Sequence, residues 1–202
     1  MQEATSLPSN LVSTDTIIGG ATYAAGTEAF FLQMRPLWAT IRSIVQKLET
    51  RQVYSQEGNP SFDALESGDF RRAIELLPRS VEGDRDLYES LRSRRVEFVR
   101  CRPLEFPLTN YMRWELEHYK LNAQEGERIY CCDLKDHRAL FSDYAKHDFM
   151  IFDQLQACVH DYDADGCLRG GWIISDAERI SELQRLYAWV RSSSRPFETF
   201  LS

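Results

Sequence analysis

Residues 85–120 read RDLYESLRSRRVEFVRCRPLEFPLTNYMRWELEHYK, and this segment decides the fold class. Apolar side chains recur at helical spacing over residues 85–94, whereas residues 96–101 alternate apolar and polar side chains as a half-buried strand does. Residues 107–120 then predict a second helix, because proline is well tolerated in the first helical turn. One face of the intervening strand carries Val96, Phe98 and Arg100. A helix followed by a strand is the repeating unit of an α/β protein.

The segments on either side continue this alternation. The expected helices are 27–41, 62–66, 69–77 (ended by Pro78), 85–94, 107–120 and 176–190. The expected strands lie within 44–54 and at 96–101, 128–132, 149–152, 155–162 and 168–174. The turn DADG at 163–166 separates the last two strands and predicts a β-hairpin. Together these elements predict an α/β (α+β) fold in which a mixed β-sheet is flanked by helices.

The length of the chain, 202 residues, favours one folded unit, since single cores rarely split below about 250 residues. Residues 1–26 are rich in Ser, Thr, Gly and Ala and predict a flexible N-terminal arm. The apolar pair Ile17–Ile18 is the point at which this arm would dock. We expect a single α/β domain over residues 27–192 and a C-terminal tail over residues 193–202.

The charge balance makes nucleic acid the weakest candidate partner. The net charge is -7 and the isoelectric point is near 5.2, so the molecule as a whole repels a polyanion. Direct nucleic-acid binding would have to use Arg92, Arg94, Arg95 and Arg100. Acidic side chains flank this arginine run, which is typical of a solvated helix face.

Cysteine usage and hydropathy predict a cytoplasmic protein. The five cysteines form neither a CxxC motif nor an even disulfide framework, which fits reduced thiols. Cys131 and Cys132 are neighbours in an expected strand and should face opposite sides of the sheet, so one zinc ion could not readily take both. No apolar run reaches the ~18 residues that a membrane span requires, and the N-terminus does not have the pattern of a signal peptide.

No metal or cofactor is predicted. Residues 161–166, DYDADG, begin like a calcium-binding EF-hand loop, but Trp172 stands at the twelfth position, where a bidentate glutamate is required. The four histidines do not form a ligand-spaced pair on one element, and no glycine-rich phosphate loop is present in the sequence. Gly170–Gly171 are expected to mark a β-bulge or close strand packing.

The best catalytic candidates are His147, Asp148 and Asp153 in the segment HDFMIFD. Phosphodiesterases of the phospholipase D type use a histidine nucleophile with a lysine two residues later to hold phosphate. Here that position is Phe149, and the lysine, Lys146, precedes the histidine. The pattern therefore favours a protein that is not an enzyme, with a divergent phosphodiester-acting site as the alternative.

The residues that best fit a binding surface lie on the expected helix 107–120. Helical spacing gathers a polar and aromatic stripe opposite the apolar face of this helix. The stripe and the tyrosine beside it comprise Asn110, Tyr111, Arg113, Trp114 and Glu117. Such a stripe would suit a protein partner or an anionic ligand. The equally simple alternative is that Trp114 packs on a neighbouring element and that Arg113 pairs with Glu117 or a carboxylate of the sheet.

Several blocks, in order, resemble the successive blocks of an uncharacterised bacterial family of domains of unknown function. The blocks are LETRQVY (48–54), FDALESGDF (62–70), VEFVRCRPLEFPLTNYMRWE (96–115), AQEGERI (123–129), HDFMIFD (147–153) and YDADG (162–166). The resemblance covers about residues 28–190. It implies a fold similar to one phospholipase-D-like half that lacks the catalytic motif, in a gene often placed beside helix-turn-helix regulators.

These observations predict a non-enzymatic regulatory or protein-interaction protein. Its partner would bind through residues 110–117 and the nearby sheet edge. A transcriptional regulator and a second copy of the chain, forming a homodimer, are the candidate partners. No cofactor and no membrane contact are predicted.

Overall fold

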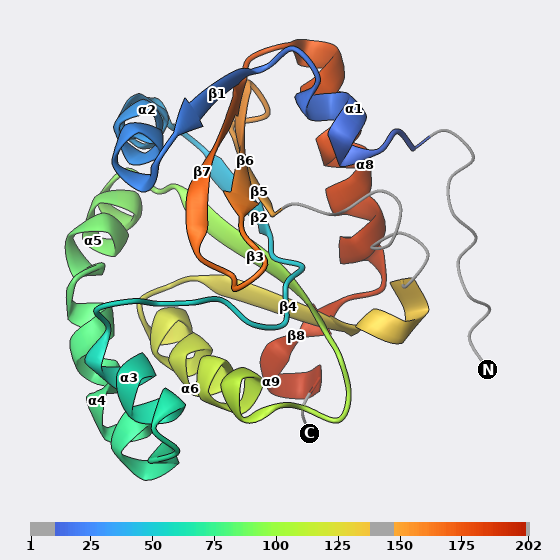
Figure 1. Cartoon of the computed structure of the whole chain (residues 1–202). Helices are drawn as coiled ribbons and strands as arrows, with labels where there is room; N and C mark the ends of the chain where they lie inside the picture. Colours follow the sequence, from blue (N-terminus) through green and yellow to red (C-terminus); the bar gives the residue numbers. More distant parts are fainter. Residues whose placement is uncertain (1–10, 138–147, 201–202) are drawn as a thin grey trace.

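One mixed β-sheet of eight strands organises the chain (Figure 1). The structure is a computed structural model, and it describes residues 11–137 and 148–200. The strands are β1 (Thr22–Ala25), β2 (Ile44–Leu48), β3 (Glu97–Leu104), β4 (Arg128–Asp133), β5 (Phe149–Phe152), β6 (Gln156–Tyr162), β7 (Leu168–Ile174) and β8 (Arg195–Pro196). Their order across the sheet is β1-β7-β6-β5-β2-β3-β4-β8. Strands β2, β3 and β4 are parallel, and β5 joins β2 in the antiparallel sense.

Helices cover both faces of this sheet, as predicted (Figure 1). They are α1 (Thr14–Ile18), α2 (Thr27–Thr40), α3 (Pro60–Glu66), α4 (Phe70–Glu82), α5 (Arg85–Ser93), α6 (Asn110–Gln124), α8 (Ala177–Ser192) and α9 (Phe197–Phe200), with a short 3₁₀ turn at Leu134–His137. Helices α1 and α8 lie on one face, and α2, α5, α6 and the α3–α4 pair lie on the other. Within the described residues, no helix combines the length and the apolar character needed to cross a membrane.

Strand alternation divides the core between the two faces. Leu48 packs with the apolar side chains of α8, whereas Val45 on the same strand packs beneath α2 and α5. Cys132 likewise belongs to the α8 side and Cys131 to the α6 side. The prediction that the two neighbouring cysteines face opposite sides of the sheet is therefore confirmed.

Both ends of the chain contribute strands to the sheet. Strand β1 pairs with β7 from Thr22 to Ala25, and Ile17 on α1 is buried against α8. At the other end, β8 pairs with β4, and Phe197 is buried. The predicted boundaries at residues 26 and 193 thus fall within the folded unit. Sequence composition did not indicate this, because two short strands add too few residues to create a periodic pattern.

Two predicted helix ends differ in the structure. Helix α4 continues past Pro78 to Glu82, and Leu77 and Val81 on either side of the proline are both buried. We attribute the continuation to this burial, which outweighs the hydrogen bond that proline removes. Helix α6 begins at Asn110 rather than at Pro107, because the Thr109 side chain accepts a hydrogen bond from the backbone N–H of Met112 and caps it there.

The predicted hairpin between β6 and β7 is confirmed, and its two glycines lie where other strands and helices approach closely. Asp161 pairs with Gly170 and Tyr162 with Leu168, so a bulge interrupts the ladder at this point. A Cβ atom at Gly171 would lie 2.3 Å from the carbonyl oxygen of Val159 and 2.5 Å from the Phe30 ring. Only glycine allows helix α2 to pack this closely on β7.

Replacing Gly171 by alanine is expected to lower the free energy of unfolding by about 2–3 kcal/mol, since the new methyl group overpacks a buried contact. Gly83→Ala is the matched control, because a Cβ there would come no closer than 3.6 Å to the Ser80 carbonyl oxygen, at an ordinary helical φ of −63°. The control should change stability by less than about 0.5 kcal/mol. Urea unfolding followed by circular dichroism measures both, and equal effects would contradict the close-packing explanation.

Candidate functional site

Helix α6 lies between the sheet and the α3–α4 pair, so that both of its sides are covered. The Trp114 side chain is 0% exposed, and its Nε1 donates a hydrogen bond to Ser61 Oγ at 2.9 Å. Tyr111 is 7% exposed, and its ring lies 5.5 Å from that of Trp114. The prediction of an exposed aromatic stripe is therefore wrong for these two residues. The alternative, in which Trp114 packs on a neighbouring element, is confirmed.

The polar members of the predicted stripe stay on the surface. Asn110 and Arg113 are exposed, and Glu117 is half-buried. Glu117 pairs with Lys120 at 2.6 Å, so it does not form the expected pair with Arg113. A role for these three residues in partner binding stays a prediction.

Beneath α6 lies a group of charged residues, which we call the polar cluster: the buried Glu49, Arg100 and Glu127, the half-buried Lys47, and the hydroxyls of Tyr88 and Tyr119. Arg100 donates to Glu127 through Nε at 2.6 Å and Nη2 at 3.1 Å, and to Glu49 through Nη1 at 2.9 Å. Lys47 contacts the second oxygen of Glu49 at 2.6 Å. Tyr119 donates to Glu49 at 2.7 Å, and Tyr88 donates to Glu127 at 2.9 Å. Every charge of the polar cluster is therefore matched within it.

Strand alternation puts the polar cluster under α6. Val45, Lys47 and Glu49 follow one another on the same side of β2 and the residues after it, and Phe98 and Arg100 do the same on β3. Burial by itself would raise the pKa of Glu49, but the Arg100 and Lys47 charges hold this pKa well below its usual range. The carboxylate is therefore ionised at neutral pH and binds its neighbours as an anion.

Two further side chains of α6 face the polar cluster without a full set of partners. Glu115 Oε2 and both ring nitrogens of His118 are buried and have no hydrogen-bond partner among the described residues. The two groups lie 4.0 Å apart, from His118 Nδ1 to Glu115 Oε2. Burial and the nearby Glu49 carboxylate raise the pKa of Glu115 to about 7, and burial lowers the pKa of His118 to about 4. Both side chains are therefore mainly uncharged between these values.

The predicted catalytic residues do not form one site in the part of the chain that the structure describes. His147 lies outside the described residues. Asp148 accepts hydrogen bonds from the Thr50 N–H at 2.6 Å, from its hydroxyl at 2.7 Å, and from the Tyr54 hydroxyl. It precedes β5, whereas Asp153 follows it, so the two carboxylates lie roughly 16 Å apart along an extended strand.

Asp153 has a structural role at the turn after β5. Its carboxylate accepts hydrogen bonds from the backbone N–H groups of Arg42 at 2.6 Å, Ser43 at 2.7 Å and Ile44 at 3.0 Å, and from the Ser43 hydroxyl at 2.7 Å. Partial burial acts to raise its pKa, but these hydrogen bonds outweigh burial and lower it. The side chain thus fixes the start of β2 to the β5–β6 turn.

The buried cysteines are poor nucleophiles. Burial raises the pKa of Cys101 to about 11, and that of Cys131, Cys132 and Cys158 to about 12. Since the thiolate is the reactive form, these thiols are unreactive at neutral pH.

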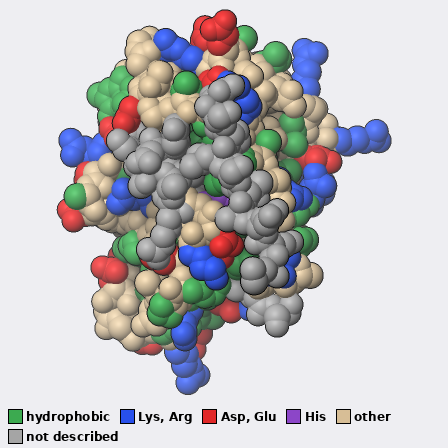
Figure 2. All heavy atoms as spheres, turned by 90° about the vertical axis from the view of Figure 1, so that its right-hand side faces the viewer, with side chains coloured by type: hydrophobic (Ala, Val, Ile, Leu, Met, Phe, Trp, Pro, Cys, Tyr) green, Lys and Arg blue, Asp and Glu red, His purple; other side chains and the backbone are tan. Residues whose placement is uncertain are grey.

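The arginines that could bind nucleic acid have separate roles. Arg94 donates to the carbonyl oxygens of Trp38 at 3.1 Å and Ile41 at 3.0 Å, at the end of α2, and Arg100 is held in the polar cluster. On the face that Figure 2 shows, Lys and Arg side chains of the described residues are interspersed with Asp and Glu. Arg92 and Arg95 remain, and both line a groove.

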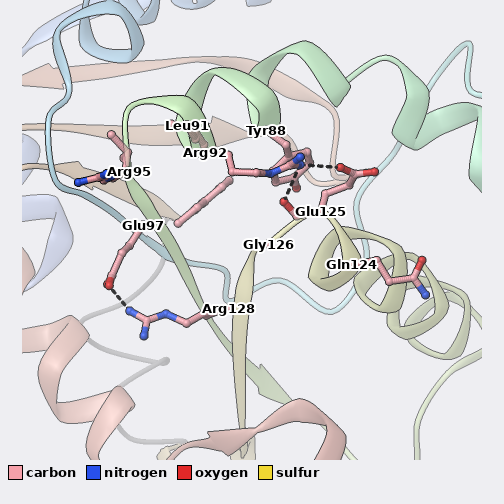
Figure 3. A pocket seen from close by; sticks show the side chains of 11 residues that line it. Tyr88, Leu91, Arg92, Arg95, Glu97, Gln124, Glu125, Gly126 and Arg128 are labelled. Carbon is pink, nitrogen blue, oxygen red and sulfur yellow. Dashed lines mark hydrogen bonds and ion pairs between the residues drawn. The ribbon is translucent and has the colours of Figure 1, made fainter.

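This groove lies at the edge of the sheet where β3 and β4 begin, and we call it the α5–β4 groove (Figure 3). Its volume is about 420 Å³. Buried side chains form its floor and charged side chains its rim. The lining residues are Tyr88, Leu91, Arg92, Arg95, Val96, Glu97, Phe98, Gln124, Glu125, Gly126 and Arg128.

Two of the three arginines of the groove are neutralised by ion pairs. Arg92 binds Glu125 at 3.0 Å, which joins α5 to the end of α6, and Arg128 binds Glu97 across β3 and β4 (Figure 3). Arg95 forms no ion pair with any described residue. It is thus the rim cation whose charge is open to a ligand.

Arg95 also has a strained backbone. Its φ of 58° places it in the left-handed region. Its N–H donates to the Arg92 carbonyl at 3.1 Å and the Val96 N–H donates to the Leu91 carbonyl at 2.9 Å, which is the Schellman arrangement at the end of a helix. Glycine usually occupies this position, since a Cβ there costs roughly 1–2 kcal/mol. Such strain in a non-glycine residue is often found at functional sites.

Sequence reasoning missed both the polar cluster and the groove. One signal was available for the cluster: Arg100 and Arg102 continue the strand face that begins with Val96 and Phe98. Arginines that share a strand face with apolar side chains are expected to be buried and to need carboxylate partners. No comparable signal marked the groove, because its walls come from two stretches of the chain, residues 88–98 and 124–128, which only the pairing of β3 with β4 brings together.

Comparison with known proteins identifies a family whose function is unknown. Residues 33–202 match the family model described as Domain of unknown function (DUF6879). No curated protein matches the sequence. A solved structure that matches is TrmBL2, an archaeal chromatin protein that shows a novel mode of DNA binding, with 10% sequence identity and a TM-score of 0.44. The match covers 95% of this chain and 56% of the TrmBL2 chain, so this chain spans little more than half of that protein. Similarity at this level carries no functional argument.

Trp114→Ala is expected to lower the free energy of unfolding by about 3–5 kcal/mol, because it empties a fully buried site and leaves the Ser61 hydroxyl without its donor. Arg113→Ala, one residue earlier on the exposed side of α6, should change stability by less than about 0.5 kcal/mol. Thermal or urea unfolding of both variants checks this. A mild effect of Trp114→Ala would mean that the indole is not a core residue.

Glu115→Gln is expected to remove a pH dependence of stability. The pKa of Glu115 is about 7 in the folded state and near 4.5 in the unfolded state, so its contribution is fully present below pH 4.5 and is lost as the pH rises through 7. The variant should therefore gain about 3 kcal/mol relative to the wild type between pH 4 and pH 8. His118 is present in both proteins and cancels in the difference.

Urea unfolding at several pH values measures this difference. Glu117→Gln, on the same helix but half-buried and paired with Lys120, is the control and should give a difference that stays within about 0.5 kcal/mol. A stability difference between Glu115→Gln and the wild type that does not change with pH would contradict the raised pKa of this carboxyl group.

Proposed function

The chain belongs to the DUF6879 family of domains of unknown function, and from its geometry we propose that it is a non-enzymatic recognition protein that binds a segment of a partner protein in the α5–β4 groove. The observation that carries the proposal is Arg95. Its guanidinium has no carboxylate partner among the described residues, its backbone conformation is strained, and it lies on the rim of a groove with an apolar floor. The strain is retained although glycine would relieve it, which is expected where the side chain serves binding.

The chemistry of the groove defines the partner segment. Tyr88, Leu91 and Phe98 offer an apolar floor, and Arg95 offers a guanidinium that can bind a carboxylate in bidentate fashion. A volume of about 420 Å³ holds a few side chains rather than a whole domain surface. The proposed ligand is therefore a short segment with one acidic residue next to an apolar one. Arginine and aromatic residues are also the types that most often dominate binding energy at interfaces.

The α5–β4 groove takes the place of Tyr111 and Trp114 as the proposed binding surface, because both of these side chains are buried. Asn110 lies fourteen residues before Gln124, so the two ends of α6 are roughly 21 Å apart. The exposed Asn110 and Arg113 belong to the far end and would form a separate contact. The predicted contact through a sheet edge near residues 110–117 stays a prediction, because the groove lies where β3 and β4 begin.

The rival functions have less support from the described residues. The carboxylates of Asp148 and Asp153 have full sets of hydrogen bonds at opposite ends of β5. Of the four arginines considered for nucleic acid, Arg94 and Arg100 are occupied by protein groups. A phospholipase-D-like ancestry, a bacterial source and a transcriptional regulator as partner stay predictions. A second copy of the chain is a rival occupant of the groove, which sedimentation equilibrium would reveal as a dimer sensitive to Arg95→Gly.

Arg95→Gly is expected to raise the stability of the protein and to weaken its binding of peptides. Removing the Cβ relieves the left-handed strain, so the free energy of unfolding should rise by about 1 kcal/mol. Selection of a displayed random-peptide library on the wild-type chain should enrich peptides in which Asp or Glu adjoins an apolar residue. Their affinity, measured by fluorescence anisotropy, should fall at least about tenfold in Arg95→Gly.

Arg113→Ala serves as the control, because it removes an equally exposed arginine at the other end of α6 and should leave peptide affinity within about twofold. Enrichment without acidic residues, or equal binding by wild type and Arg95→Gly, would refute the groove as the recognition site. A peptide that binds the Arg95→Gly variant with wild-type affinity but binds the Arg113→Ala variant more weakly would place the recognition site at the N-terminal end of α6 instead.

A further inference from the structure

A second polar site lies at the opposite edge of the sheet, where β2 and β3 end. Strand β5 is antiparallel to β2 and therefore begins at this edge, and β6 is antiparallel to β5 and therefore ends there. Strand β2 is also the boundary between the parallel and the antiparallel parts of the sheet. In open α/β sheets, ligands commonly bind outside the carboxyl ends of the parallel strands.

Arg102 is the unusual residue at this edge. Its side chain is 0% exposed, yet no described carboxylate lies within ion-pairing distance. Nη1 donates weakly to the Tyr54 hydroxyl at 3.4 Å, Nη2 lies 3.9 Å from Met112 Sδ, and Nε is buried without a partner. Arg100, two residues earlier on the same face, binds two carboxylates. A buried guanidinium without an anion costs several kcal/mol, on the order expected for burying one ion.

Tyrosine rings and a second arginine surround Arg102. The Arg102 guanidinium lies 5.4 Å from the centre of the Tyr54 ring, which lies 5.2 Å from the Tyr162 ring. The Arg51 guanidinium in turn lies 5.6 Å from the centre of the Tyr162 ring. Arg51 Nε is also buried without a partner among the described residues. Two cations with unpaired donors are therefore joined by aromatic faces.

The carboxylates nearest to these arginines are already engaged. Asp148 accepts from Thr50 and from the Tyr54 hydroxyl. Glu49 is bound by Lys47, Arg100 and the Tyr119 hydroxyl. Neither carboxylate is free to neutralise Arg102. Arg51 Nη2 donates to the Ala164 carbonyl at 3.4 Å, so the Nε groups of Arg51 and Arg102 are the donors that have no partner among the described residues and can bind an anion from outside.

Helix α6 covers Arg102 on one side through Met112, and a loop covers it on the other. Residues 49–59 connect β2 to α3 and contribute Arg51 and Tyr54. Gln52 fixes the loop to the end of β3, since its Nε2 donates to the Pro103 carbonyl at 3.0 Å and its Oε1 accepts from the Glu105 N–H at 2.9 Å. Gln56 Nε2 reaches the Tyr111 hydroxyl at only 3.5 Å. Opening such a loop costs less than moving a packed helix, so a ligand can reach Arg102 by this path.

The geometry points to a binding site for a small organic molecule with an oxyanion group, a carboxylate or a phosphate, bound by Arg102 and bordered by the rings of Tyr54 and Tyr162, with Arg51 against the Tyr162 ring as a second cation of the site. The anion would supply the partner that Arg102 lacks, and the tyrosine faces would contact an unsaturated or aromatic body. This site is independent of the α5–β4 groove, which lies at the other end of β3.

Titration of the full-length chain with inorganic phosphate, acetate and benzoate tests the site, at an ionic strength held constant with sodium chloride. We expect saturable binding of at least one probe with a Kd of about 1 mM or below, by NMR or calorimetry. Phosphate against acetate separates the two oxyanions, and benzoate against acetate reports the contribution of the tyrosine rings. Binding that is weakened at least about tenfold in Arg102→Met, and unchanged within about twofold in Arg35→Met, which removes an exposed arginine of α2, supports the assignment.

Arg102→Met should fold, because replacing a buried charge by an apolar side chain of similar size is often neutral or stabilising. If the variant does not fold, Arg51→Met and the side-chain Nε signal of Arg102 in the wild-type NMR spectrum decide instead. A shift of that signal on titration, together with weaker binding by Arg51→Met, supports the site. Failure of all three probes to bind, an unchanged Nε signal, or equal binding by Arg102→Met would overturn it.

Discussion

Arg100 lies on the central parallel strand β3, beneath α6, and is neutralised by Glu49 at the end of β2 and by Glu127 just before β4. One guanidinium thereby joins three consecutive parallel strands. A buried ion pair gains little over an apolar substitute, but removal of one partner costs about 3–5 kcal/mol, because the remaining charge stays buried. The register of these strands and the position of α6 above them are therefore coupled, because a shift of either would disturb the ion pairs of Arg100. This requirement also explains why the apolar side chains beneath α2 and α5 and those beneath α6 form separate clusters.

The same network supports the floor of the α5–β4 groove. Tyr88 lines the groove, and its hydroxyl donates to Glu127, which holds Arg100. The groove is thus built on the most constrained part of the sheet, while its rim consists of long arginine and glutamate side chains. A rigid base with adaptable charged groups around it is the arrangement by which recognition sites limit the entropy lost on binding. The strained Arg95 backbone can persist there because the Schellman hydrogen bonds and the buried Val96 on its C-terminal side hold it.

The two sites use the two ends of β3, which are roughly 23 Å apart over residues 97–104. They also differ in the way their charges are compensated. At the groove, ion pairs neutralise Arg92 and Arg128 and leave Arg95 on the surface. At the other end, Arg102 is buried and the desolvation cost of its charge is not offset by any described carboxylate. The first arrangement suits a protein segment that binds at a surface, and the second suits a small anion that enters the fold.

The sequence by itself determined the order of the helices and strands between residues 27 and 192, the mixed sheet, the β6–β7 hairpin and the opposite faces of Cys131 and Cys132, because each depends on local periodicity or on a turn of a few residues. Only the tertiary structure decided that the α3–α4 pair covers Trp114, and that the partners of Arg100 come from the ends of two other strands. Both facts depend on segments that lie tens of residues apart in the chain, and a periodic pattern shows that a side chain is on one face of an element without showing what lies against that face.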